Sequence, residues 1–304
     1  VSLNGGNAVR VNERIYSNNG DITINAGAGG NLMNTGGITV DGFSLVLSDT
    51  DARRGNLTLV ARGDINAPSV RTVGTLTITS TEGRILSGSV DQSRDGAVGT
   101  IGTGMPQFVR LAGALGIDNF DTRNSPDVEA RSSQGSVQLA VFFPQRLFIQ
   151  AAQDVRTGGF IGNEVELVAG NDVIIPGIGL AGIVRANAGR DFLLNGESTV
   201  SAMSVNAGRD IRLPTAGGDV TWVAGIGGTM TSRDPASLGA VLNLSGLSLT
   251  AGRDVLAPQP VHVSDTLAVT TVEATLRPTT MAAGRNLLLG HLETIGDVSL
   301  SAAT

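Results

Sequence analysis

Apolar and polar residues alternate in short runs along most of the chain, and one such run centres on Leu249. Leu247, Leu249 and Ala251 alternate there with Ser248 and Thr250. Because successive side chains of a strand point to opposite faces, this spacing places the apolar set in a core and the hydroxyls in solvent. No segment keeps the i, i+3, i+4, i+7 apolar spacing of an amphipathic helix beyond a couple of turns. The pattern predicts an all-β chain built from many short strands.

One phrase recurs along the chain: alternating apolar residues, then Ala-Gly-Arg-Asp, then a further apolar residue. Its copies, some of them loose, begin at Ala151, Ala169, Ala188, Ala207, Ala251 and Ala283, and the aspartates that mark it are Asp154, Asp172, Asp191, Asp210 and Asp254. The first four aspartates are separated by 18, 19 and 19 residues, and Asp210 and Asp254 by 44. Asp21 and Asp64 are 43 residues apart. We interpret the longer separations as two periods of about 20 residues each.

A period of about 20 residues fits few repeat architectures. Propeller blades, ankyrin repeats and tetratricopeptide repeats are longer, and the leucine-rich phrase is missing. We therefore predict a right-handed parallel β-helix, a β-solenoid in which each period is one coil of two or three short strands. We expect residues 1–304 to form a single β-helix segment of a longer protein. The repeat phrase disappears at about residues 88–130, which predicts a loop-rich insertion there.

The repeat phrase has a structural explanation at the corner between two strands. Gly252 permits backbone angles that a Cβ would hinder, and the carboxylate of Asp254 can accept backbone amides of the turn. Val255 then resumes the inward apolar set. Stacked aspartates repel one another, and a column containing Arg190 and Arg209 would offset this repulsion weakly, since we expect both columns to be exposed. The five aspartates of the phrase are therefore interpreted as structural corners.

Composition narrows the functional classes. Aromatic residues make up 3% of the chain, so few aromatic anchors are present for a deep ligand pocket. The net charge is −6 and all 21 basic residues are Arg, which gives no electrostatic footprint for nucleic acid. Cysteine is absent, which excludes disulfides and Cys-ligated zinc, and no apolar run is long enough to span a membrane as a helix. We expect no cofactor and no metal ion.

Two groups of residues are candidates for specific chemistry. Arg62-Gly63-Asp64 is a triplet that integrins read in some adhesins, but the segment around it is also the repeat phrase with Gly and Arg exchanged. The triplet is therefore a candidate binding site with a structural alternative. His262 and His291 lie 29 residues apart with no third ligand at metal spacing, so neither catalysis nor metal binding is predicted for them.

The recurring Ala-Gly-Arg-Asp-apolar phrase, preceded in several copies by Asn or Thr, resembles the repeats of filamentous haemagglutinin and of other exoproteins of two-partner secretion systems. These include the stalks of contact-dependent inhibition proteins. Residues 145–300 carry the resemblance most clearly, and residues 20–85 more loosely. The resemblance implies export through a dedicated outer-membrane transporter, a β-helix outside the cell, and roles in adhesion, biofilm formation, virulence or toxin delivery. The Asn-Pro-Asn-type motifs of the family's secretion domain are missing, which favours a stalk region.

On this basis we predict a non-enzymatic stalk or adhesin of a secreted bacterial surface protein. Its expected partners are an outer-membrane transporter during export and a receptor or glycan on a host-cell or bacterial surface. The alternative is a polysaccharide-degrading β-helix enzyme, a lyase or hydrolase, which would gather carboxylates, Arg or His in a groove on one face. The periodic aspartates favour the structural role, because a single active site does not repeat along a chain.

Overall fold

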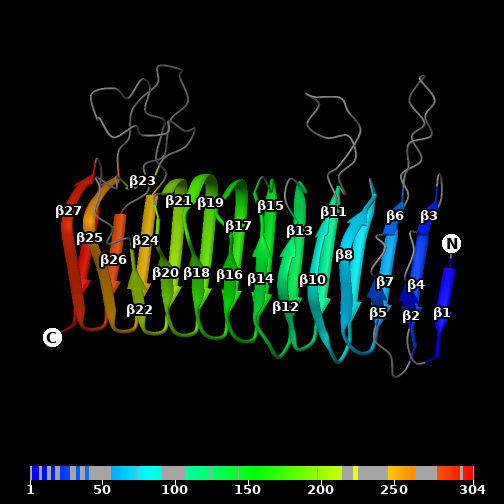
Figure 1. Cartoon of the computed structure of the whole chain (residues 1–304). Helices are drawn as coiled ribbons and strands as arrows, with labels where there is room; N and C mark the ends of the chain where they lie inside the picture. The colour runs from blue at the N-terminus through cyan, green and yellow to red at the C-terminus, as the bar shows by residue number, and fades with distance from the viewer. Residues whose placement is uncertain are drawn as a thin grey trace, which may run out of the picture. The chain divides into compact units, whose positions relative to one another are not determined.

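The computed structural model of the chain consists of β-strands (Figure 1). The residues that it describes are 2–6, 9–11, 15–17, 21–27, 32–34, 38–40, 56–72, 74–90, 107–122, 125–142, 144–196, 198–213, 222–224, 246–263, 279–294 and 297–303. Every regular element in these ranges is a strand, which confirms the all-β prediction. The same ranges contain no helix long and apolar enough to cross a bilayer.

The chain divides into two compact units. Unit 1 comprises Val1–Pro144 and Phe148–Ala152, and unit 2 comprises Gln145–Leu147 and Gln153–Thr304. The strands of unit 1 are β1 (Ser2–Gly5), β2 (Val9–Val11), β3 (Ile15–Ser17), β4 (Ile22–Ala26), β5 (Leu32–Asn34), β6 (Ile38–Val40), β7 (Leu57–Ala61), β8 (Ile65–Arg71), β9 (Thr75–Ser80), β10 (Arg84–Val90), β11 (Phe108–Gly113), β12 (Gly116–Asp121), β13 (Asp127–Ser132) and β14 (Val137–Ala140). β15 (Arg146–Ala151) belongs to unit 1 from Phe148 onward.

The strands of unit 2 are β16 (Val155–Thr157), β17 (Phe160–Ala169), β18 (Val173–Ile175), β19 (Ile178–Ala188), β20 (Phe192–Leu194), β21 (Ser198–Ala207), β22 (Asp210–Arg212), β23 (Trp222–Ala224), β24 (Gly246–Ala251), β25 (Asp254–Val263), β26 (Thr279–Ala283), β27 (Asn286–Thr294) and β28 (Val298–Ala302). The expectation that residues 1–304 form one continuous segment stays a prediction.

In unit 1 the chain returns to each strand position once per coil. β7 pairs in parallel with β4 before it and with β9 after it, so Ile22, Leu57 and Leu76 stand in register. β8 pairs in the same way with β5, through Ile65 and Leu32. Parallel strands that stack in register from one turn of the chain to the next form a parallel β-helix, as the repeat predicts.

Three strand positions make up a coil. In unit 1 the first strands are β1, β4, β7, β9, β11 and β13, the second strands are β2, β5, β12, β14 and the beginnings of β8 and β10, and the third strands are β3, β6 and the ends of β8 and β10. In β8 and in β10 the second and third strands are continuous.

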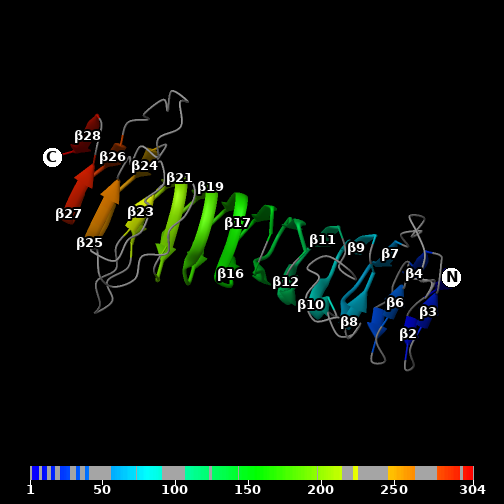
Figure 2. The ribbon, with the colours of Figure 1, turned by 90° about the horizontal axis from the view of Figure 1, so that it is seen from above.

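Unit 2 repeats this plan, and its strands follow one another side by side in two perpendicular views (Figures 1 and 2). β17, β19 and β21 each carry a third strand that runs directly into the next first strand. Ala188 stands in register with Ala169 on one side and Ala207 on the other. The later first strands are β24, β26 and β28, and the second strands are β16, β18, β20, β22 and the beginnings of β25 and β27.

The core lies inside the coils, where the alternating apolar residues point. Leu249 and Val255 have no exposed surface, whereas Thr250 between them in the sequence is exposed. The largest fully buried side chains are Phe120, Phe160 and Phe192. Alternation around Leu249 therefore gives the correct inward and outward sets.

Two corners of the coil differ in length. The tight corner joins a first strand to a second strand and carries the Gly-Arg-Asp part of the repeat phrase; in unit 2 it lies at residues 170–172, 189–191, 208–210, 252–254 and 284–286. The long corner joins a third strand to the next first strand. Its longest connections lie between β6 and β7, between β10 and β11, between β23 and β24, and between β25 and β26.

The interpretation of the longer aspartate separations as two periods is wrong. Asp210 and Asp254 stand directly in register, so the 44 residues that separate them form one coil with a long connection in it. Asp21 is followed by a first strand and Asp64 by a second strand, so they occupy different corners. Asn56, whose backbone N–H donates to the carboxylate of Asp21 at 2.7 Å, takes the equivalent place one coil later.

Strands occupy part of the region, at about 88–130, for which the sequence predicts a loop-rich insertion. Residues 107–122 form β11, β12 and their corners, residues 125–130 lead into and begin β13, and residues 91–106 lie outside the described residues. The repeat phrase is absent because another sequence makes this tight corner. Gly116 adopts a φ of 148°, a conformation that side chains other than hydrogen disfavour.

Candidate functional site: an aspartate–arginine ladder

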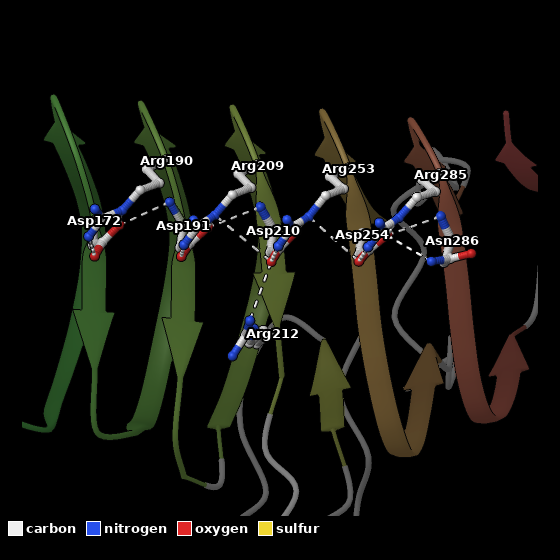
Figure 3. A network of polar contacts seen from close by, with 10 residues as sticks. All are labelled: Asp172, Arg190, Asp191, Arg209, Asp210, Arg212, Arg253, Asp254, Arg285 and Asn286. Atoms are coloured by element: carbon white, nitrogen blue, oxygen red, sulfur yellow. Dashed lines mark hydrogen bonds and ion pairs between the residues drawn. The ribbon is translucent and has the colours of Figure 1, made fainter.

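At four tight corners of unit 2, the aspartate binds the arginine of the following coil (Figure 3). The Nε atom of Arg190 donates to Oδ1 of Asp172 at 2.8 Å, and its Nη2 atom donates to Oδ2. The same two-point contact joins Arg209 to Asp191, Arg253 to Asp210 and Arg285 to Asp254. We call these four pairs the ladder. Its guanidinium and carboxylate groups meet in the fork-to-fork arrangement that Arg favours.

The aspartates of the ladder are buried, contrary to the exposed columns expected from the sequence. Asp210 is 1% exposed, whereas the side chain of Arg253 above it is 40% exposed. The carboxylate therefore lies beneath the guanidinium, which covers it from solvent. An exposed ion pair is worth little, but a carboxylate shielded in this way depends on its partner much more.

Backbone amides complete the environment of the carboxylates. The N–H of Asp191 donates to Oδ1 of Asp172 at 3.2 Å, and the N–H of Asp210 donates to Oδ1 of Asp191 at the same distance. Asp254 accepts both the N–H and the side-chain amide of Asn286, at 3.2 and 3.1 Å. The sequence suggested that such a carboxylate binds amides of its own turn. These amides belong to the next coil, so each aspartate joins two coils.

Hydrogen bonds from arginine lower the pKa of three carboxyl groups, those of Asp172, Asp210 and Asp254. Hydrogen bonding from Arg190 lowers the pKa of Asp172 below its ordinary value, and burial opposes this effect. Hydrogen bonding from Arg253 lowers the pKa of Asp210, and hydrogen bonding from Arg285 lowers that of Asp254. These carboxylates are consequently ionised at neutral pH, which suits charge pairing and not proton donation.

Glycine precedes each arginine of the ladder because the coils approach closely there. A Cβ atom on Gly252 would stand 2.2 Å from the carbonyl oxygen of Gly208, and one on Gly208 would stand 2.2 Å from that of Gly189. Real Cβ atoms do not come so near to backbone oxygen. The stacked glycines bring consecutive corners near enough for arginine to reach the aspartate of the preceding coil.

The ladder ends where the phrase changes. Asn171 stands in the arginine position above Asp154, and Asp154 instead pairs with Arg156 of its own coil, at 3.1 Å. Asn286 stands in the aspartate position at the other end. The five predicted corner aspartates thus stack in one file, and four of them form the ladder.

This arrangement links each coil to the next. Its carboxylates and guanidinium groups bind each other, and they repeat in every coil from Asp172 to Arg285. Across the described ranges, no group of three or more His, Asp or Glu residues is placed to hold a metal ion. The side chains of His262 and His291 lie outside the described set, although their strands β25 and β27 are neighbours.

The Arg62-Gly63-Asp64 triplet forms a tight corner of unit 1. Arg62 pairs with Glu82 of the next coil, with Nε and Oε2 2.6 Å apart. Oδ1 of Asp64 accepts the backbone N–H of Arg84 at 2.8 Å. The carboxylate that an integrin would bind is thus engaged in joining two coils. This geometry favours the structural alternative for the triplet.

Sequence reasoning missed a group of outward side chains on β11, β13 and β15, the aromatic–arginine patch. Glu129 lies between two arginines and accepts Nε of Arg110 at 3.4 Å and Nε of Arg131 at 2.6 Å. The guanidinium carbon of Arg110 lies 5.1 Å from the ring centre of Phe108, and that of Arg131 lies 4.7 Å from the ring centre of Phe148. Both arginine side chains are more than half exposed. The signal in the sequence was an aromatic residue at an outward strand position.

Comparisons with known proteins leave the resemblance to filamentous haemagglutinin without independent support. No protein-family model, curated protein or solved structure matches this chain.

Proposed function

We propose that this chain is a β-helical stalk region of a secreted bacterial surface exoprotein of the filamentous haemagglutinin type. One observation carries the proposal: the charged residues that repeat along unit 2 are used in coil-to-coil pairs at the tight corners. A scaffold needs such linkage in every coil. An enzyme needs its acids and bases to converge once.

The Ala-Gly-Arg-Asp phrase supports the same proposal from the sequence side, since it resembles the repeats of two-partner exoproteins. In that setting the chain is exported by an outer-membrane transporter and extends an adhesive or toxic module from the cell surface. Antibodies raised against this chain should then label intact cells that make the full-length protein. Deletion of the transporter should abolish labelling of intact cells but not of lysates. Retention of surface labelling after that deletion would contradict this route.

A contact with a surface glycan would use the aromatic–arginine patch. Exposed aromatic rings stack against the apolar faces of sugars, and planar guanidinium groups bind carboxylates or hydroxyls at two points. Phe108 and Phe148 bring half-buried rings to an outward face, in a chain that has eight Phe in all. Arg110 and Arg131 provide the guanidinium groups beside them.

The test is fluorescence anisotropy with labelled neutral and uronate-containing oligosaccharides. A double variant, Phe108→Ser with Phe148→Ser, should weaken binding of any oligosaccharide that the chain binds by at least about tenfold, since each stacked ring contributes on the order of 1 kcal/mol. Arg185→Gln, which alters an exposed pair in unit 2, is the matched control. Equal oligosaccharide binding by the double variant and the control would show that the aromatic–arginine patch is not the binding site.

The enzyme alternative makes a different prediction for the same oligosaccharides. A lyase or hydrolase would shorten them, and Glu129 of the patch is the carboxylate best placed to take part. Both of its carboxylate oxygens are engaged in ion pairs with arginine, whereas a hydrolase needs carboxyl groups that are free to meet the bond it cleaves. We therefore expect binding without turnover. Turnover that is lost in Glu129→Gln would overturn the proposal.

A further inference from the structure

Extra chain enters the coils mainly at one corner. In a short coil of unit 2, Ala181 pairs with Val200 and Ile183 pairs with Ala202. Only one residue separates Ala181 from Ile183 in the chain, and only one separates Val200 from Ala202. One coil later, Val200 pairs with Ala224 but Ala202 pairs with Gly246. The strands on both sides of the long corner thus keep their register although the chain between them has lengthened. A smaller extension lies between β22 and β23 of the same coil.

Unit 1 shows the same preference independently. β6 ends at Val40 and β7 begins at Leu57, and β10 ends at Val90 and β11 begins at Phe108. Both gaps are connections at the long corner. The tight corners that follow β7 and β9 remain only a few residues long.

The ladder is insensitive to these length changes. Arg209 reaches Asp191 across 18 residues of chain, and Arg253 reaches Asp210 across 43. The Nε to Oδ1 distances are 2.7 and 2.8 Å. The packing of the tight corners is also unchanged. A Cβ on Gly252 would lie 2.2 Å from the carbonyl oxygen of Gly208, and a Cβ on Gly208 would lie 2.2 Å from the carbonyl oxygen of Gly189.

Loop closure explains why a linkage is needed at this point. Bringing the ends of a flexible segment together becomes less probable as roughly the 3/2 power of its length. By that relation a coil closed over 43 residues is roughly fourfold less probable than one closed over 18. A two-point ion pair over a buried carboxylate offsets this cost and fixes which coils are neighbours.

We infer that the long corner is the insertion site of this fold, and that the ladder is the clamp that holds the coils in register across insertions in unit 2. The inference does not depend on the proposed function. A chain of this kind carries additional segments at one corner while the stacked core stays the same. Any inserted segment, whatever it binds, is displayed from that corner.

Two insertions in the full chain test the site. A flexible insert of about 20 Gly and Ser residues is placed either after Gly182, at the long corner of a short coil, or after Gly189, at a tight corner. The long-corner insert should leave the unfolding midpoint nearly unchanged, and the inserted segment should be cut by protease without loss of the remaining fold. The tight-corner insert should unfold the coils around it, because Gly189 N–H and Arg190 N–H donate to the preceding corner at 2.9 and 2.8 Å. Equal damage from the two inserts would overturn the inference.

Hydrogen exchange tests the clamp. Arg253→Gln removes a ladder pair across the 43-residue coil, and Arg209→Gln removes one across an 18-residue coil. The coil that contains β24 should then be open roughly fourfold more often in the first variant than the coil that contains β21 in the second. If the two variants open equally and the chain tolerates the insert after Gly182, the ladder does not act as a clamp. The long corner would then still be the insertion site.

Discussion

Asp210 accepts two hydrogen bonds from Arg253, which lies 43 residues further along the chain but only one coil away in the structure. Asp210 is almost fully buried, and Arg253 covers it. Long-range pairs of this kind define neighbouring coils more sharply than apolar stacking can, because aliphatic side chains fit many partners. The repeat phrase therefore encodes the order of the coils as well as the turn itself.

Replacing an arginine of the ladder by lysine should destabilise the protein although the charge is kept. In Arg209→Lys a single ammonium group replaces the planar fork, so one of the two hydrogen bonds to Asp191 is lost. We expect the free energy of unfolding to fall by about 1 kcal/mol. Arg185→Lys, which alters the exposed pair with Glu164, should lower it by less than about 0.5 kcal/mol. Chemical denaturation of both variants measures the difference, and equal losses would show that shielding of the carboxylate adds nothing.

Acid should weaken the ladder. The pKa of Asp172, Asp210 and Asp254 is lowered from 3.8 in the folded chain, chiefly by hydrogen bonds from arginine. A carboxyl group whose folded pKa is depressed contributes stability that is complete above its unfolded pKa and is lost as the pH falls through the folded pKa. The contribution of these three groups to the free energy of unfolding should therefore be constant near neutral pH and should decline below about pH 4.

Asp210→Asn separates this effect from general acid unfolding. The variant lacks one of the titrating groups, so its free energy of unfolding should be lower than that of the unmodified chain at pH 7 and should approach it as the pH falls below about 4. Unfolding curves at a series of pH values provide the measurement. A constant difference across the whole range would show that Asp210 has the same proton affinity in the folded and unfolded chain.

Much of the coil could be predicted from local sequence. Leu247, Leu249 and Ala251 point inward because strand geometry alone fixes alternation. The spacing of Asp172, Asp191 and Asp210 indicated one corner per coil, since equal spacing in sequence implies equal position in a repeat. Both inferences use neighbours within a few residues or a constant period.

The sequence failed where distant residues decide the structure. Asp254 follows Asp210 by one coil, but a count of residues cannot separate one long coil from two short ones. Burial of the aspartates was missed because it depends on an arginine from the next coil. The aromatic–arginine patch was missed for the same reason: Arg110 meets Glu129 only after two first strands have been placed in register.

A methyl group at a stacked corner should be far more damaging than one at an open glycine. In Gly252→Ala the new Cβ would lie 2.2 Å from the carbonyl oxygen of Gly208, so two coils must separate. We expect a loss of about 2–4 kcal/mol, as in other overpacked sites with backbone displacement. In Gly159→Ala the nearest atom, the carbonyl oxygen of Gly177, is 3.5 Å away, and the loss should be below about 1 kcal/mol. Thermal unfolding compares the two, and similar midpoints would mean that the corners have room to separate.

A charge placed in the core should unfold the coils next to it, whereas the same charge one residue away should be tolerated. Leu249 has no exposed surface and stacks on Val205 and Met281 of the adjoining coils, so Leu249→Asp buries an unpaired carboxylate there. The loss should exceed about 4 kcal/mol, because the variant combines a cavity with an unpaired buried charge. Thr250→Asp adds the same charge to an outward position and should cost less than about 0.5 kcal/mol. Hydrogen exchange of residues 246–256 distinguishes the variants: protection should be lost in the first and kept in the second. Retained protection in Leu249→Asp would mean that β24 does not contribute its apolar face to the core.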